Sequence, residues 1–144
     1  MFQASDGTNG ERRGWMQLLA RAPLAMLENG MRRAGESGSL PGRVWLRKPE
    51  TGLVMLRGRA GGAGELFNLG EMTLTRCVLR IDTGEAGVAY VKGRSPRHAE
   101  LAALADALLQ SAPWRETMLR RLIEPLRAHL EAEAARQRHK AQAT

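Results

Sequence analysis

The stretch between residues 57 and 64 holds the residue types best suited to binding an anion: two arginines followed by three glycines. Arg57 and Arg59 can form forked hydrogen bonds to a phosphate, phosphonate or polyphosphate. Gly61, Gly62 and Gly64 let the backbone approach a ligand closely and point its amides into a concave site. Neither a Gly-Lys-Ser/Thr sequence nor the Gly-x-Gly-x-x-Gly order is present, so the known nucleotide signatures fail. The alternative interpretation is a wide turn between strands with exposed arginines.

Three other side chains also have both a functional and an ordinary structural interpretation. Arg76 alternates with apolar neighbours, so it can line a cleft or an interface, and a solvated sheet face is the alternative. His98 lies in the first turn of an expected helix, where the dipole disfavours its charged form and leaves a neutral imidazole that can act as a base or donor. Packing or exposure to water is the ordinary role of such a histidine. Cys77 is expected to be a small buried hydrophobe. No Ser–His–Asp or paired-carboxylate arrangement appears, so the sequence shows no complete catalytic site.

Positive charge is concentrated around this stretch. The 144 residues carry 22 basic and 15 acidic side chains, a formal charge of +7, and all but three of the basic residues are arginines. Residues 43–97 hold ten basic and five acidic residues, whereas the segments on either side each have a net charge of +1. All 16 glycines lie at or before Gly93. A basic, glycine-rich centre is therefore followed by a segment suited to helices.

Helices are predicted on both sides of this centre. Apolar residues recur at helical spacing in four segments, 15–22, 23–31, 96–108 and 113–130. Ser95 is placed to cap the third helix, with Pro96 at its first position. Pro125 is expected to kink the fourth helix, because it lacks a backbone donor and crowds the preceding turn.

Strands are predicted between the helices, in runs rich in β-branched and large apolar residues. The runs are 44–47, 53–57, 72–81 and 87–92. Asp82–Glu85 is typical of a hairpin connection, and short links favour an antiparallel meander. We therefore expect one α+β domain over residues 1–144, with a small antiparallel sheet of about four strands flanked by N-terminal and C-terminal helices. Residues 1–10 are expected to be flexible, and residues 131–144 to form a polar helical tail.

The composition excludes several classes of protein. At 43% hydrophobic residues the chain can build one core. It contains no apolar stretch long enough to span a membrane, and its N-terminus lacks the order of a secretory signal. A single cysteine excludes an internal disulfide and any multi-cysteine metal site. The sequence thus predicts a soluble, cytoplasmic protein with no membrane contact and no bound metal.

A longer pattern surrounds the arginines and glycines. Residues 50–64 read ETGLVMLRGRAGGAG, and residues 67–73 read FNLGEMT, followed by Arg76-Cys77. Further matching segments are Arg13, 15–16, 19–20, 87–90, 93–94, 98–103 and 106–108. This pattern resembles the PhnG family, the G subunit of the bacterial carbon–phosphorus lyase machinery, over residues 12–130.

The resemblance implies an accessory or structural subunit that is not catalytic alone. Its implied partners are the H, I and J subunits of a cytoplasmic complex, with a functional link to the ATPase-like L subunit. With H, I and L, the G subunit is needed to transfer the ribose triphosphate of ATP to an alkylphosphonate, which releases adenine; radical cleavage of the carbon–phosphorus bond belongs to J. ATP and the phosphonate are then substrates of the complex, and no cofactor is expected on this chain. Isolated chains can self-associate through surfaces meant for other subunits.

Two hypotheses for the site follow from the resemblance and the residues together. The candidates for contact with an anion, or with a neighbouring subunit, are Arg57, Arg59, Gly61, Gly62, Gly64, Arg76 and His98. The candidates for contact with a partner are Phe67, Asn68 and Glu71. Family members continue past an Ala-Thr with a tail that contains an aromatic residue, whereas this sequence stops at Ala143-Thr144. A subunit contact made by that tail would be missing here.

A basic nucleic-acid-binding module is the alternative function. The six aromatic residues offer little surface for stacking on bases. No helix-turn-helix, zinc-finger or RNA-binding sheet signature appears. We therefore expect no nucleic-acid partner, and favour the subunit interpretation.

Overall fold

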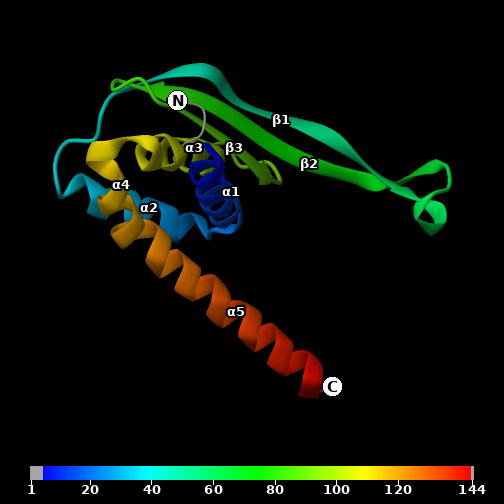
Figure 1. Ribbon diagram of the computed structural model, residues 1–144. Helices are drawn as coiled ribbons and strands as arrows, with labels where there is room; N and C mark the ends of the chain where they lie inside the picture. The colour runs from blue at the N-terminus through cyan, green and yellow to red at the C-terminus, as the bar shows by residue number, and fades with distance from the viewer. Residues whose placement is uncertain (1–4, 144) are drawn as a thin grey trace.

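The centre of the chain folds into an antiparallel sheet, as expected. The computed structural model describes residues 5–143 (Figure 1). Its three strands are β1 (Arg43–Arg59), β2 (Leu66–Ile81) and β3 (Ala86–Lys92), in the order β1-β2-β3. The predicted connection Asp82–Glu85 joins β2 to β3, closed by a hydrogen bond from the Gly84 amide to the Ile81 carbonyl. The α+β class and the meander are thereby confirmed.

The sheet has three strands rather than about four because β1 is continuous through residues 48–52. The predicted runs 44–47 and 53–57 lie on either side of this segment, which contains a proline and a glycine. β1 lies at the edge of the sheet, however, where Pro49 needs no hydrogen bond from its nitrogen. Shifts in the pairing register between Trp45 and Arg47, and again before Glu50, absorb the irregular segment.

The helices lie on one face of the sheet. They are α1 (Ser5–Arg21), α2 (Leu24–Gly35), α3 (Pro96–Gln110), α4 (Ala112–Met118) and α5 (Glu124–Ala143). Helix α3 lies directly against β2 and β3, with α1, α2 and α4 packed around it (Figure 1). Gly87 permits the close approach of β3 to α3, because any side chain there would collide with the backbone carbonyl of Ala103. Helix α3 is consequently buried on nearly all sides, and it carries much of the core, including Leu101, Leu104 and Leu108.

The ends of the helices agree with the local sequence signals. Ser95 occupies the N-cap position of α3 and Pro96 is its first residue, as expected, but the Ser95 side chain makes no capping hydrogen bond. Before Pro125, where a kink was expected, the structure has one π-helical turn, Leu119–Ile123, between α4 and α5. In this wider turn the Glu124 amide reaches back to the Leu119 carbonyl, immediately before the proline that cannot donate.

Helices α1 and α5 form the two ends of the described chain. Residues 5–10, expected in a flexible terminus, belong to α1, and residues 1–4 lie outside the described residues. A helix extends readily from an anchored turn, and α1 is anchored further along at Arg12 and Trp15. Helix α5 leaves the body after Leu130, and its polar remainder projects away from the sheet (Figure 1). No helix within residues 5–143 is both long and apolar enough to cross a membrane.

Cys77 lies on the face of β2 that packs against the helices, where its side chain is fully buried. Burial, followed by the nearby negative charge of Glu100, raises the pKa of its thiol to about 11. The expectation of a small buried hydrophobe is confirmed.

This environment predicts an unreactive thiol in the folded chain. At about pH 8 we expect a disulfide reagent to label Cys77 only after denaturant is added, since only the thiolate reacts and the folded state holds the proton. Because the pKa is raised on folding, the stabilisation from the protonated thiol is lost as the pH rises from about 8.5 to about 11. Rapid labelling without denaturant would contradict both the burial and the raised pKa.

Candidate functional site

The most exposed apolar surface lies on the end of the β1–β2 hairpin. β3 pairs only with residues 74–80 of β2, so residues 53–73 continue as a two-stranded projection beyond the third strand. We call this segment the arm, and Figure 1 shows it reaching away from the helices. The pairing within it runs from Leu53 opposite Thr73 to Arg59 opposite Leu66. The arm therefore has two faces, and neither is covered by the helical layer.

Both faces of the arm carry exposed apolar side chains, and one of them also carries polar and charged ones. Residues that pair directly share a face, which places Leu53 and Met55 with Thr73 and Glu71 on one side. The opposite side holds Val54, Leu56, Phe67, Leu69 and Met72. Leu53 is 69% exposed and Leu69 is 64% exposed. A cluster of exposed large apolar side chains of this kind is typical of a site that contacts another molecule.

The tip of the arm is a compact turn closed by its own hydrogen bonds. Gly61 and Gly62 have φ angles of 64° and 80°, which favour glycine over other residues. The Gly64 amide donates to the Ala60 carbonyl over 2.8 Å, and Arg59 Nη1 donates to the Gly64 carbonyl over 3.1 Å. Three of the expected site glycines thus shape one turn, whose ends are joined by Arg59.

Arg57 and Arg59 form no ion pair with any residue of the described chain, in contrast to several arginines of the same basic segment. Arg57 pairs across the strands with Asn68, near the apolar Phe67. The structure therefore brings together the expected anion-binding residues and the expected partner-contact residues, which are Arg57, Arg59, Gly61, Gly62, Gly64, Phe67, Asn68 and Glu71. At the end of the arm, Arg57, Arg59 and Asn68 lie on the face of Leu53 and Met55, and Phe67 lies on the opposite face.

Arg76 lies on the body of the sheet, separated from the tip. It is eight residues from Asn68 along β2, roughly 25 Å at the rise of a strand. Its guanidinium is 3.0 Å from Glu50 Oε1, which also accepts from Arg47 over 3.0 Å. Hydrogen bonds from Arg76 and then Arg47 lower the pKa of the Glu50 carboxyl. Arg76 is thus engaged in a surface ion-pair cluster and does not reach the tip of the arm.

His98 also lies apart from the arm, in the first turn of α3. Its Nε2 is 2.8 Å from the backbone carbonyl of Leu19 at the end of α1. A carbonyl oxygen only accepts hydrogen bonds, so this contact requires the proton on Nε2. The imidazole therefore joins α3 to α1. The position in the first turn was predicted correctly, but the sequence did not reveal this partner 79 residues away.

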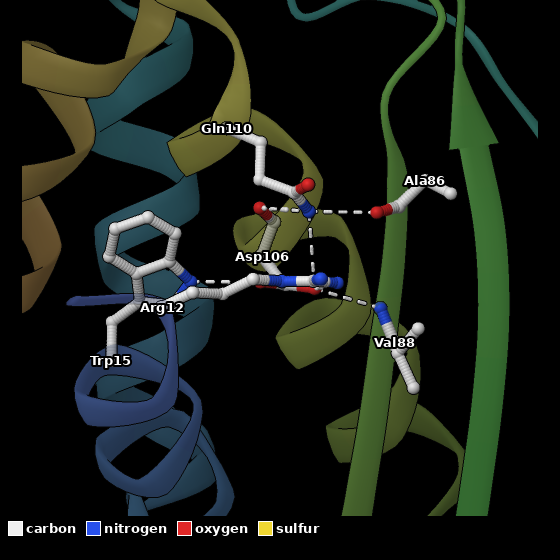
Figure 2. A network of polar contacts seen from close by, with 6 residues as sticks. All are labelled: Arg12, Trp15, Ala86, Val88, Asp106 and Gln110. Atoms are coloured by element: carbon white, nitrogen blue, oxygen red, sulfur yellow. Dashed lines mark hydrogen bonds and ion pairs between the residues drawn. The ribbon is translucent and has the colours of Figure 1, made fainter. Parts of the chain in front are cut away.

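A buried carboxylate is the main polar feature that the sequence analysis did not identify. Asp106 on α3 is fully buried and accepts hydrogen bonds from α1, β3 and its own helix (Figure 2). Its oxygens accept from Arg12 Nη2 over 2.9 Å, from Trp15 Nε1 over 2.8 Å and from the Val88 amide over 3.0 Å. Gln110 adds a weaker contact and donates to the Ala86 carbonyl over 2.8 Å. The hydrogen bond to Asp106 raises the pKa of Arg12.

This network is a structural element that fixes α1 and β3 on α3. Its carboxylate oxygens are already occupied by protein donors, so it offers no open position for a ligand. The only sequence signal was the spacing of Arg12 and Trp15, which puts both on one face of α1. Among residues 5–143 no group of three or more His, Cys, Asp or Glu side chains could hold a metal ion.

Fold and surface together define a small α+β protein with an arm suited to docking on another protein. The family model of phosphonate metabolism protein PhnG matches residues 10–144, and the chain belongs to this family. A protein of Rhizobium meliloti (strain 1021), alpha-D-ribose 1-methylphosphonate 5-triphosphate synthase subunit PhnG, is 41% identical over 141 residues. The alignment covers 98% of this chain and 88% of that protein. The family expected from residues 50–77 is thereby confirmed.

Proposed function

We propose that the chain is an accessory subunit of the carbon–phosphorus lyase complex, required for transfer of the ribose triphosphate of ATP to an alkylphosphonate with release of adenine. Membership of the PhnG family and the name of the Rhizobium relative, a synthase subunit, support this function. The structural observation that carries it is the arm, a large apolar surface that the chain itself leaves uncovered.

The stem of the arm, residues 53–56 and 66–72, is the proposed contact with a partner subunit. Since both of its faces carry exposed apolar side chains, a partner that covered one face would leave those of the other in water. The H, I or J subunit therefore encloses the stem, or two of them sandwich it. Full burial of each large apolar side chain contributes roughly 1.5–3 kcal/mol, which makes the stem a substantial source of affinity.

The tip of the arm is the proposed contact with anionic substrate. Burial of the stem carries Arg57 and Arg59 into the complex, where neither guanidinium brings an acidic partner from residues 5–143 of its own chain. A forked contact from arginine suits the oxygens of a phosphonate or of the triphosphate of ATP. In this proposal the chain has no cofactor of its own, ATP is a substrate of the complex, and the assembly acts in the cytoplasm with the L subunit.

Co-expression with the H, I and J subunits tests the proposed function. We expect the tagged chain to retain all three on purification, and the complex to release adenine from ATP and methylphosphonate once the L subunit is added. The purified chain alone should release none, which serves as the control for catalysis by this subunit. A chain that purifies without partners, or a complex that turns over equally well without it, would contradict the proposal.

A further inference from the structure

A second surface, far from the tip of the arm, has the geometry of an incomplete sheet. We propose that the free edge of β3, from Val88 to Lys92, is a docking site that accepts an extended acidic segment of a partner protein as a fourth strand. The arm plays no part in this proposal, so its failure would leave the proposed function unaffected.

The direction of the backbone groups along β3 follows from the contacts of its first residues. The Val88 amide donates to Asp106 Oδ2 over 3.0 Å, and the Ala86 carbonyl accepts from Gln110 Nε2 over 2.8 Å. Both groups therefore point away from β2. Since direction alternates along a strand, the backbone groups of Tyr90 and Lys92 point to the same free edge.

Side chains of α3 form hydrogen bonds only with the first backbone groups along this edge. The Asp106 carboxylate accepts from the Val88 amide, and the Gln110 amide donates to the Ala86 carbonyl, as Figure 2 shows. In the described part of the chain no hydrogen bond reaches the Tyr90 amide, the Tyr90 carbonyl or the Val88 carbonyl. A row of unpaired donors and acceptors of this kind is the template used when a peptide adds to a sheet.

The two edges of the sheet are protected very differently. β1 carries Pro49, and its pairing with β2 has three shifts of register; such irregularities prevent further pairing at its outer edge. β3 reads AGVAYVK and pairs with β2 in unbroken register from Ala86 to Lys92. It contains no proline and no bulge, so its edge remains regular and open to a further strand.

A groove beside this edge provides room for side chains of an added strand. The cavity has a volume of about 460 Å³ and lies between α1 and β3. Met16 and Ala20 of α1 line it together with Ala102 of α3 and the edge residues Val88 and Tyr90. An extended segment would place alternate side chains in this apolar groove while its backbone pairs with Tyr90.

The positive charges of Arg13 and Lys92 beside the groove favour an acidic partner segment. Arg13 lines the groove and forms no ion pair with any residue of the described chain, as is also true of Lys92 at the end of the edge. Arg12 is already paired with Asp106. Acidic side chains on the added segment would meet these cations. A second copy of this chain fits poorly, because pairing of two β3 edges would bring together two basic rims on molecules of charge +7.

Amide exchange and peptide binding on the full chain test this proposal. The probe is a short, blocked peptide of alternating glutamate and valine, and the matched probe replaces glutamate with lysine. In the free chain we expect the Tyr90 amide to exchange rapidly and the Val91 amide, which faces β2, to be protected. Addition of the glutamate peptide should slow exchange at Tyr90 and shift the resonances of residues 88–92. The lysine peptide should do neither.

Two variants separate the backbone contact from the side chain. Tyr90→Pro removes the edge donor without removing a bond to β2, whereas Tyr90→Ala keeps that donor and removes only the ring. We expect Tyr90→Pro to weaken peptide binding roughly tenfold relative to Tyr90→Ala, the effect of one lost backbone hydrogen bond. Arg13→Glu, which leaves the sheet intact, should reverse the preference between the two peptides.

Several results would overturn the proposal. A Tyr90 amide already protected in the free monomer would mean that the edge is closed. Equal binding by the two Tyr90 variants, or resonance shifts confined to the arm, would place the peptide elsewhere. Self-association that Tyr90→Pro abolishes would assign the edge to a second copy of the chain instead.

Discussion

Replacement of Asp106 with alanine is expected to lower the free energy of unfolding by about 3–5 kcal/mol, the usual cost of removing one member of a buried charged pair. The carboxylate is fully buried, and Arg12, which faces it, is 31% exposed. Asp106→Ala leaves the Trp15 indole N–H and the Val88 amide without their acceptor. Since a domain is stable by only about 5–15 kcal/mol, this variant should unfold at a much lower urea concentration.

Two matched variants show whether the effect comes from the network itself. Ser111 is also fully buried, but its hydroxyl has no hydrogen-bond partner in the described part of the chain, so Ser111→Ala should be close to neutral. Glu133 forms an exposed ion pair with Arg136 over 2.7 Å, and Glu133→Ala should leave the urea midpoint nearly unchanged because exposed pairs contribute little. If the urea midpoint of Asp106→Ala matched those of the two controls, Asp106 would not hold α1 and β3 to α3.

Local signals predicted those parts of the fold that depend on neighbours in the sequence. Ser95 and Pro96 marked the start of α3 because a proline is favoured at the first helical position whatever lies elsewhere in the chain. Asp82–Glu85 marked the hairpin because only four residues separate the two strands. The continuity of β1 could not be predicted in this way. Whether Pro49 interrupts a strand depends on whether the strand has a neighbour on that side, and this is a property of the whole sheet.

The site was predictable to the extent that its residues are close in the sequence. The tip arginines and glycines are adjacent in the chain, and the pairing of β1 with β2 brings Phe67 and Asn68 to them. Arg76 and His98 were grouped with the tip by residue type, and their actual partners, Glu50 and the Leu19 carbonyl, lie far away in the sequence. Asp106 could not be distinguished from a surface acid, because its burial depends on three separate elements.

The stem of the arm allows assembly to be tested separately from folding. Leu53→Glu and Leu69→Glu each place a charge on one face of the arm, at positions 69% and 64% exposed in the isolated chain. We expect both variants to keep the urea midpoint of the unmodified chain and to lose retention of the H, I and J subunits on purification, since burying an unpaired charge at an interface is costly. Retention of partners by both variants would mean that the stem lies outside the interface.

The tip is expected to affect turnover rather than assembly. Arg57→Ala combined with Arg59→Ala should leave the complex intact and lower adenine release at least about 100-fold, the usual effect of removing a donor that stabilises charge in the transition state. Arg136→Ala combined with Arg138→Ala, two exposed arginines on α5, is the matched control and should leave turnover unchanged. Loss of partners by the tip variant would make the arginines an assembly contact. Normal adenine release by the tip variant would mean that the tip of the arm is only a turn between two strands. Only an intact but inactive complex supports contact between the two arginines and the anionic substrate. In that result assembly depends on the stem, which the Leu53→Glu and Leu69→Glu variants test, and turnover depends on the tip.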